Sequence, residues 1–226
     1  MERYKISDIK ALAPLTNRYR LKPIEGEIEY IAGQFAFIHL LNENNESVVK
    51  RPYSIASAPG DELEFCIKII GGELTKKLDQ MKVGDVVGIE QAGGHFAYND
   101  EKKVGMIAGG TGIAPMMSIL RDAEKRNIEG EFTLFYSTRS KDFILYREEL
   151  EKFNKNGKFK IIITLTREDW EGETGRVSKE MIERHVPNAA DLNWWICGPL
   201  SMAKERKDEL VSLGASPKQI KIEGWG

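Results

Sequence analysis

The stretch Val104-Gly-Met-Ile-Ala-Gly-Gly-Thr-Gly-Ile-Ala-Pro115 decides the fold of the second half of the chain. A short apolar run enters a glycine turn, and a helical pattern follows directly. Gly110 and Gly112 are spaced as Gly-x-Gly, which lets backbone amides and a helix N-terminus approach a pyrophosphate. Pro115 stands where the dinucleotide-binding pattern has its third glycine, and proline is tolerated in the first turn of a helix. We therefore expect a dinucleotide site here; a tight strand-to-helix connection without a ligand is the alternative.

Outward from this turn, apolar runs alternate with helical patterns. Expected strands cover residues 104–108, 132–136, 159–165, 194–197 and 220–223, and expected helices cover 116–125, 145–153, 179–184 and 201–213. Strands that alternate with helices of this length predict βαβ units and a parallel sheet.

The first half has a different pattern. Short β-rich stretches at 35–41, 53–56, 63–70 and 86–90 are separated by turns rich in Asn, Gly and Pro, and 75–81 has the pattern of a single helix. Many short strands with regular turns predict an antiparallel sandwich or barrel. With a linker at 99–103, we expect two domains: an antiparallel β-barrel at 1–98, then a Rossmann-like α/β domain with a parallel sheet at 103–226.

The composition excludes several classes of protein. The 226 residues are 41% hydrophobic with a net charge of −2, which argues against disorder and against nucleic-acid or anionic-membrane binding. Two distant cysteines, Cys66 and Cys197, exclude a disulfide scaffold, an iron–sulfur cluster and a cysteine-built metal site, so no metal is expected. The chain has no apolar run long enough for a membrane span and no signal-peptide pattern, so we expect a cytoplasmic protein.

A second candidate stretch is Arg51-Pro-Tyr-Ser54, within an expected strand. An arginine fork suits a phosphate, a tyrosine ring can stack, and a serine hydroxyl can donate to a ring nitrogen. From these residues alone, a half-buried strand with an exposed arginine is the favoured interpretation, and a ligand-binding strand is the alternative.

Three motifs taken together resemble the ferredoxin–NADP reductase superfamily. They are Arg51-Pro-Tyr-Ser54, Gly109-Gly-Thr-Gly-Ile-Ala-Pro115 and Cys197-Gly-Pro-Leu-Ser-Met202, and their order and spacing match from about residue 5 onward. The resemblance implies a flavin-binding barrel followed by a nicotinamide-nucleotide-binding α/β domain. It also implies an oxidoreductase that passes a hydride between NAD(P)H and FAD and then delivers electrons to an external acceptor.

The resemblance implies a set of flavin contacts. Arg51 would pair with the flavin phosphates, Tyr53 would pack against the ring system or ribityl, and Ser54 would hydrogen-bond near N5. The turn from Gly72 to Thr75 would hold the pyrophosphate at a helix start. The full expected set is Arg51, Pro52, Tyr53, Ser54, Ile67, Lys68, Ile69, Gly71, Gly72, Leu74, Thr75 and Trp225.

It also implies the nicotinamide-nucleotide contacts and the catalytic groups. Cys197 would shape the nicotinamide pocket without acting as a nucleophile, Glu223 would belong to a proton network, and Trp225 would cover the flavin face. The expected catalytic residues are Ser54, Cys197 and Glu223. The expected nucleotide contacts are Gly110, Thr111, Gly112, Pro115, Ser137, Thr138, Arg139, Tyr146, Arg167, Cys197, Gly198, Pro199 and Met202.

The choice of cofactor and acceptor is less determined. After the second parallel strand no carboxylate follows until Asp142, whereas an NAD site usually has an acid there, so Arg139 and Arg167 favour the 2′-phosphate of NADPH. NADH stays open, as do solvated loop cations. The resemblance favours FAD over FMN.

Three acceptors are considered: a ferredoxin or flavodoxin, an oxygenase component of a larger redox complex, and free flavin, in which case the protein is a flavin reductase with loosely bound flavin. A nucleotide-binding module without redox function is the non-enzymatic alternative.

Overall fold

The N-terminal part of the molecule is a β-barrel. The structure is a computed structural model and describes residues 1–225. The strands pair in the order β4-β3-β6-β1-β2-β5, each antiparallel to its neighbour, and a bridge between Ile55 and Phe65 joins the ends of this sheet. The strands are β1 (Glu2–Ala13), β2 (Thr16–Glu25), β3 (Phe35–Leu41), β4 (Ser47–Ser54), β5 (Leu63–Lys68) and β6 (Val86–Ile89), with the helix α1 (Glu73–Gln80) beside them.

The C-terminal part is a six-stranded parallel sheet in the order β10-β9-β8-β7-β11-β12. Its strands are β7 (Lys103–Gly109), β8 (Glu131–Thr138), β9 (Phe159–Leu165), β10 (Glu173–Thr174), β11 (Asn193–Pro199) and β12 (Ile220–Trp225). Its helices are α2 (Ile113–Lys125), α3 (Arg147–Lys155), α4 (Lys179–His185) and α5 (Leu200–Ser212). The strand order reverses between β7 and β11, and open α/β sheets bind ligands at the carboxyl ends of the strands at such a point.

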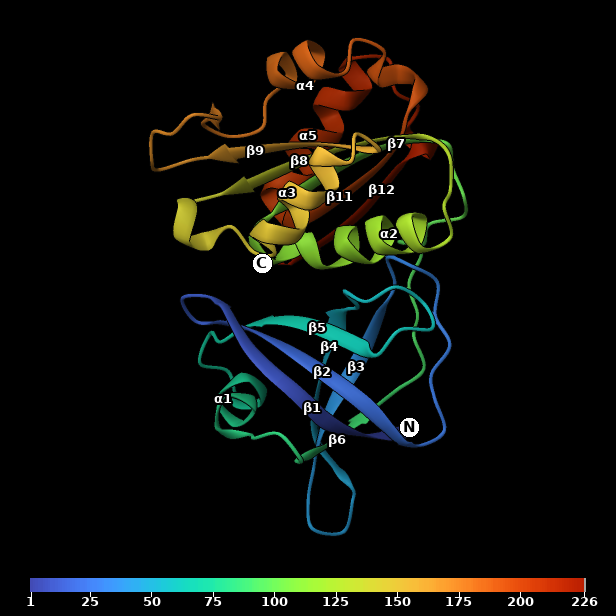
Figure 1. Cartoon of the computed structure of the whole chain (residues 1–226), viewed down its shortest axis with the longest axis vertical. Helices are drawn as coiled ribbons and strands as arrows, with labels where there is room; N and C mark the ends of the chain where they lie inside the picture. The colour runs from blue at the N-terminus through green and yellow to red at the C-terminus, as the bar shows by residue number, and fades with distance from the viewer. Residues whose placement is uncertain (226) are drawn as a thin grey trace.

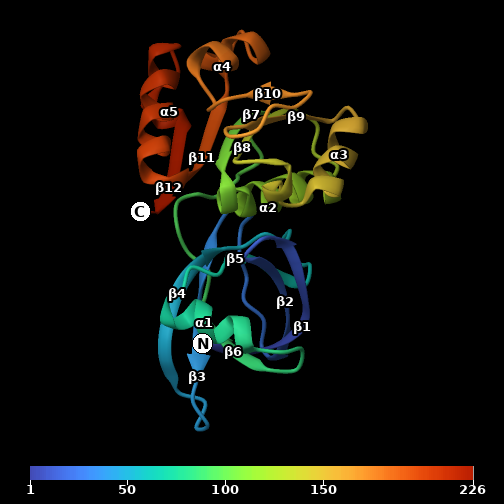
Figure 2. The ribbon, with the colours of Figure 1, turned by 90° about the vertical axis from the view of Figure 1, so that its left-hand side faces the viewer.

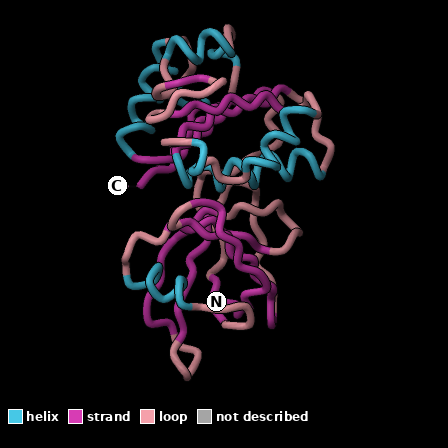
Figure 3. Tube along the Cα trace, turned by 60° about the vertical axis from the view of Figure 1, so that its left-hand side comes forward, coloured by secondary structure: helices cyan, strands magenta, loops and turns pink. Residues whose placement is uncertain are grey.

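Helices cover both faces of this sheet (Figure 2). Buried side chains of α2 and α3 pack on one face, and those of α4 and α5 pack on the other. Along β11, Trp194 and Trp195 are both fully buried and enter opposite cores, as alternation along a strand requires. The tube view separates this mixed half from the strand-rich barrel (Figure 3).

The helix α2 lies between the parallel sheet and the barrel (Figure 1). Ten of its 13 side chains are buried, and a helix that is buried on nearly all sides belongs to a core. The same hydrophobic cluster contains barrel residues, namely Ala32, Ala56, Cys66, Phe96 and Tyr98. The two domains therefore share one core around α2.

The predicted architecture is confirmed, with differences in detail. The two longest strands of the barrel, β1 and β2, were not expected from the sequence, and neither was the short β10. The helix expected from residue 145 begins at Arg147, because Tyr146 has a left-handed backbone (φ 56°) and Leu145 precedes this turn. No helix among residues 1–225 is long and apolar enough to cross a membrane.

A close contact in this sheet provides a test of the packing. A Cβ atom on Gly105 of β7 would stand 2.4 Å from the ring of Trp194 on β11. Gly105→Ala should therefore lower the free energy of unfolding by about 1–3 kcal/mol, as overpacked cores do. Urea unfolding with an unchanged m-value would measure this. Gly93→Ala is the control, because a Cβ there meets nothing within 4 Å. An equal loss of stability in both variants would show that the contact between Gly105 and Trp194 is not the cause.

Candidate functional site

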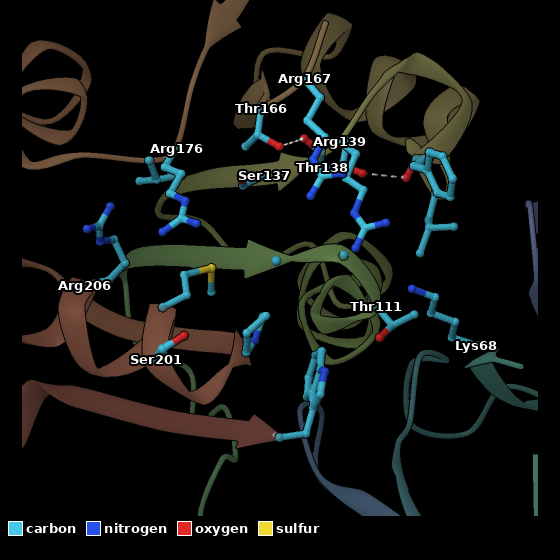
Figure 4. Close-up of a pocket in the computed structure, with 18 of the residues that line it drawn as sticks. Lys68, Thr111, Ser137, Thr138, Arg139, Thr166, Arg167, Arg176, Ser201 and Arg206 are labelled. Carbon is cyan, nitrogen blue, oxygen red and sulfur yellow. Dashed lines mark hydrogen bonds between the residues drawn. The ribbon is translucent and has the colours of Figure 1, made fainter. Parts of the chain in front are cut away.

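A pocket of about 510 Å³ opens at the carboxyl ends of β7, β8 and β11, where the strand order reverses. Thr16 and Trp225 line it, and so does Lys68 of the barrel (Figure 4). Most of the predicted nucleotide residues line it: Gly110, Thr111, Ser137, Thr138, Arg139, Arg167, Pro199 and Met202.

The glycine turn leaves space for a ligand. Gly110 has φ +54°, and a Cβ atom there would meet nothing within 4 Å, so the backbone is open to close approach. A 3-10 turn at Gly110–Gly112 runs directly into α2, and the Ile113 amide bonds to the carbonyls of Gly110 and Thr111. The N-cap of this turn is Gly109, which provides no side-chain acceptor, so the turn's own amides suit an anion, which the helix dipole favours. Gly112 itself is needed for packing, since a Cβ would lie 2.2 Å from the carbonyl oxygen of Cys197.

The upper end of the pocket in Figure 4 is polar and cationic. Arg139 and Arg167 lie there beside Thr138 and Thr166, and Arg176 lies apart from them, next to Arg206 (Figure 4). The Thr166 hydroxyl donates to the carbonyl of Thr138 (3.2 Å), which ties the two strand ends together. Among all pocket-lining residues, Glu205 is the sole carboxylate, against the cations Lys68, Arg139, Arg167, Arg176 and Arg206. A ligand with several phosphates suits this set of charges.

Ser54, Glu223 and Cys197 meet where the two domains join. The Ser54 hydroxyl donates to Glu223 Oε2 (2.9 Å), and the Cys197 thiol lies 3.9 Å from the same oxygen. Burial raises the pKa of Glu223, and hydrogen bonds from Ser54 and Cys197 offset this in part. Burial, together with the neighbouring Glu223, raises the pKa of Cys197 well above its usual range, so the thiol stays protonated at neutral pH. This agrees with a role for Cys197 in shaping the pocket, because a thiol is a poor nucleophile.

The barrel side of the junction offers donors for a second phosphate group. Arg51 is exposed and donates to the adjacent carbonyl of Lys50 (2.7 Å). Gly72 is the N-cap of α1 and also lacks a side-chain acceptor, so the amides of the first turn are open. Burial raises the pKa of Tyr53 to about 12, so its ring is a neutral packing surface. This donor set fits the pyrophosphate and ring system of a flavin dinucleotide.

Tyr146, an expected nucleotide contact, does not line the pocket. Its ring is buried beneath the guanidinium of Arg121, 5.0 Å from the ring centre, in the boundary between the domains. The left-handed backbone at this residue directs the ring away from the pocket, which is lined instead by Phe143 and Leu145.

Two expected flavin contacts, Ile67 and Leu74, have side chains buried in the barrel core, which leaves only their backbone atoms for a ligand.

Several pocket residues were not expected from the sequence, among them Arg176, Arg206 and Phe143. Arg176 follows Gly175 in the loop between β10 and α4, and the side chain of Arg206 is nearly buried on α5. Residues 1–225 hold no group of three or more His, Cys, Asp or Glu suited to a metal ion.

Family models match both parts of the chain. Residues 4–98 match an oxidoreductase FAD-binding domain, and residues 106–208 match an oxidoreductase NAD-binding domain. A relative from Rattus norvegicus, NADH-cytochrome b5 reductase 2, is 30% identical over 75% of this chain and 74% of its own length.

Two solved structures share the fold. The flavohaem-like FAD/NAD-binding domain of a nitric oxide dioxygenase from Vibrio cholerae O1 biovar El Tor superposes with a TM-score of 0.90. It is 22% identical and covers 100% of this chain and 98% of its own. A ferredoxin NADP+ reductase from Neisseria gonorrhoeae, with bound FAD and NADP, gives a TM-score of 0.84 at 23% identity, over 98% of this chain and 97% of its own.

Because the carboxyl of Glu223 is buried, we expect replacing it with an amide to increase the stability of the fold in a pH-dependent way. Because its pKa is raised on folding, its ionised form destabilises the folded state at high pH, and the effect disappears when it is protonated in both states. Glu223→Gln should raise the free energy of unfolding by on the order of 1 kcal/mol near pH 8 and by nothing below about pH 4. Urea titrations at the two pH values measure this. Glu43→Gln, in the exposed β3–β4 turn, should change neither value, and a loss of stability in Glu223→Gln near pH 8 would contradict the prediction.

Proposed function

Because this chain belongs to the ferredoxin–NADP reductase superfamily and carries FAD-binding and NAD-binding oxidoreductase domains, we propose that it oxidises NADPH and passes the electrons to a separate redox protein. When bound, FAD supplies the chemistry that amino acids lack, which is to take two electrons as a hydride and to release them singly. The observation that carries the proposal is the meeting of Ser54, Glu223 and Cys197 beside the cationic pocket.

These three side chains orient the reactants and manage protons. When Glu223 is protonated it can donate to the Ser54 oxygen, which frees the Ser54 hydroxyl to donate to a ring nitrogen of the flavin. Cys197, protonated and buried, limits where the nicotinamide can lie. The raised pKa of Glu223 brings this carboxyl nearer to neutral pH, where it can exchange protons with Ser54.

The polar end of the pocket supports NADPH over NADH. Ser137 lies at the end of β8, Arg139 and Arg167 follow the ends of β8 and β9, and Arg176 lines the same pocket from the loop before α4. A carboxylate for the ribose 2′-hydroxyl, common in NAD sites, has no counterpart there. Guanidinium groups bind phosphate through paired, charge-assisted hydrogen bonds, so a 2′-phosphate fits this end. In this respect we propose that the chain differs from its relatives that are named for NADH.

The acceptor is proposed to dock at the edge formed by Trp225 and Leu200. These side chains are 43% and 41% exposed, and they adjoin at the ends of β12 and β11. Exposed apolar side chains beside a redox site are suited to a protein partner. The Rattus norvegicus relative is named for cytochrome b5, and ferredoxin, flavodoxin and an oxygenase component are the other candidates.

The experiment is a visible spectrum of the purified protein, followed by anaerobic titration with NADPH and then NADH. We expect a co-purified flavin that bleaches faster with NADPH, and cytochrome b5 and ferredoxin are then tested as acceptors. A colourless protein that oxidises NADPH only with added free flavin would make flavin the substrate. A protein that oxidises neither nucleotide would overturn the proposal.

Nucleotide selectivity gives a second prediction. Arg139→Ala should lower kcat/KM for NADPH by roughly 10- to 100-fold and leave kcat/KM for NADH unchanged, because a lost hydrogen bond to a charged group costs about 1.5–3 kcal/mol. Steady-state assays with ferricyanide as acceptor measure both values. Arg184→Ala is the matched control, since Arg184 is exposed on α4 and pairs with Glu173. Parallel losses with both nucleotides would argue against a 2′-phosphate contact.

Ser54 gives a third prediction, on the rate of flavin reduction. Ser54→Ala removes the hydroxyl between Glu223 and the flavin site, and loss of one such oriented donor typically costs about 10²-fold in rate. Anaerobic stopped-flow reduction by NADPH should show this loss with unchanged flavin content. Ser47→Ala, on the same strand but bonded to His39, should reduce at the normal rate. Equal rates in the two variants would remove Ser54 from the mechanism.

A further inference from the structure

One face of α2 is bonded to the barrel at three successive positions. Ser118, Arg121 and Lys125 are spaced three and four residues apart, so they lie on one side of the helix. Their side chains donate to backbone carbonyls: Ser118 to Ser57 (2.6 Å), Arg121 to Ala56 (2.8 Å) and Lys125 to Pro59 (3.0 Å). We call these three side chains the α2 seam.

The α2 seam connects the two halves of the catalytic cluster. Its acceptors lie in residues 56–59, which follow Ser54 almost directly. At its other end, α2 begins beside Gly112, which packs tightly against the carbonyl of Cys197. One rigid helix therefore links Cys197 in the nucleotide domain to the strand that carries Ser54.

Arg121 is the central and most heavily bonded member of the seam. Its guanidinium forms two hydrogen bonds to Glu149 of α3 (both 2.7 Å) and one to Glu64 of β5 (2.8 Å). It also lies over the ring of Tyr146. Only 14% of its side chain is exposed, and all three of its nitrogens have partners. A side chain with this many partners is held in one orientation. The carbonyl of Ala56, which accepts one of its hydrogen bonds, is therefore held in one position as well.

We propose that Arg121 is a positioning residue for hydride transfer, acting through the α2 seam to set the distance between the nicotinamide pocket and the flavin strand. The inference rests on the proposed function. In the step concerned, NADPH gives up a hydride, one proton with two electrons, and becomes NADP+, while bound FAD is reduced by two electrons. The rate of such a step depends steeply on distance, and an error of 1 Å can cost about 10²-fold.

The two ends of the nucleotide should respond differently to a loose seam. The adenosine end is held by Arg139, Arg167 and Arg176, which all belong to the α/β domain. The nicotinamide end must meet a group carried by the barrel. Removing a hydrogen bond of the α2 seam should therefore slow hydride transfer and leave the affinity for the adenosine phosphate unchanged.

The test compares Arg121→Met with wild type in three measurements on the flavin-loaded protein. These are the anaerobic rate of flavin reduction at saturating NADPH, the Kd for adenosine 2′,5′-bisphosphate, and the long-wavelength absorbance that appears when nicotinamide stacks on flavin. Arg121→Lys is included because a lysine keeps the charge but cannot form the same fork. Arg147→Met is the matched control, since Arg147 is exposed on α3 and pairs with Glu151 alone.

We expect Arg121→Met to lower the reduction rate about 10- to 100-fold, to weaken the long-wavelength band, and to leave the Kd for the bisphosphate within about two-fold of wild type. Arg121→Lys should recover part of the rate, and Arg147→Met should match wild type. A normal rate in flavin-loaded Arg121→Met would overturn the inference, as would an equal loss in Arg147→Met. A wild-type protein whose flavin is reduced by neither NADPH nor NADH would overturn the proposed function instead.

A second variant covers the case in which Arg121→Met fails to fold or to retain flavin. Ser118→Ala removes a single buried hydroxyl from the seam and keeps the ionic partners intact. It should lower the reduction rate several-fold at unchanged flavin content and unchanged affinity for the bisphosphate. A normal rate in Ser118→Ala would overturn the inference.

Discussion

Glu64 and Arg121 meet across the domain boundary at 2.8 Å, with 2% and 14% of their side chains exposed. A buried ion pair is stable only when its remaining donors and acceptors are also satisfied, and here Arg20, Glu149 and the carbonyl of Ala56 satisfy them. Burial alone would raise the pKa of Glu64, but the guanidinium groups of Arg121 and Arg20 together outweigh it and lower the pKa. Any shift of one domain against the other would separate these charges, so the arrangement of the junction depends on this contact.

The second buried carboxyl at the junction, Glu223, has the opposite environment. Its partners are a hydroxyl and a thiol, which offset its loss of hydration only in part, so burial raises its pKa while that of Glu64 is lowered. A buried carboxyl whose lost hydration is not fully compensated destabilises the fold when it is ionised. Groups with such shifted pKa values cluster at active sites. Of the two buried carboxyls at the junction, Glu64 holds the domains together, and Glu223 is the one suited to chemistry between them.

Much of the fold was predictable because its signals are local. The parallel half has continuous apolar strands and a glycine turn at 109–112, and the structure has strands and a turn at these positions. The strands β1 and β2 were missed because charged residues face outward along them and their turn at Pro14 and Leu15 lacks the usual glycine or asparagine. The burial of Tyr146 outside the pocket was not predictable, because its left-handed backbone is a feature of the fold that the sequence pattern does not show. Arg176 was missed because the folding back of a loop, a tertiary event, brings it to the pocket.

The core around α2 has a consequence for how the molecule comes apart. Barrel residues such as Ala32, Phe96 and Tyr98 belong to the same buried cluster as α2 and the parallel sheet. Separation of the two domains would expose this apolar surface on both, and exposed apolar surface promotes aggregation. The two domains are therefore expected to unfold in one cooperative transition, although each half of the chain matches a family model of its own. Each family model therefore covers only part of the structure that folds as a whole.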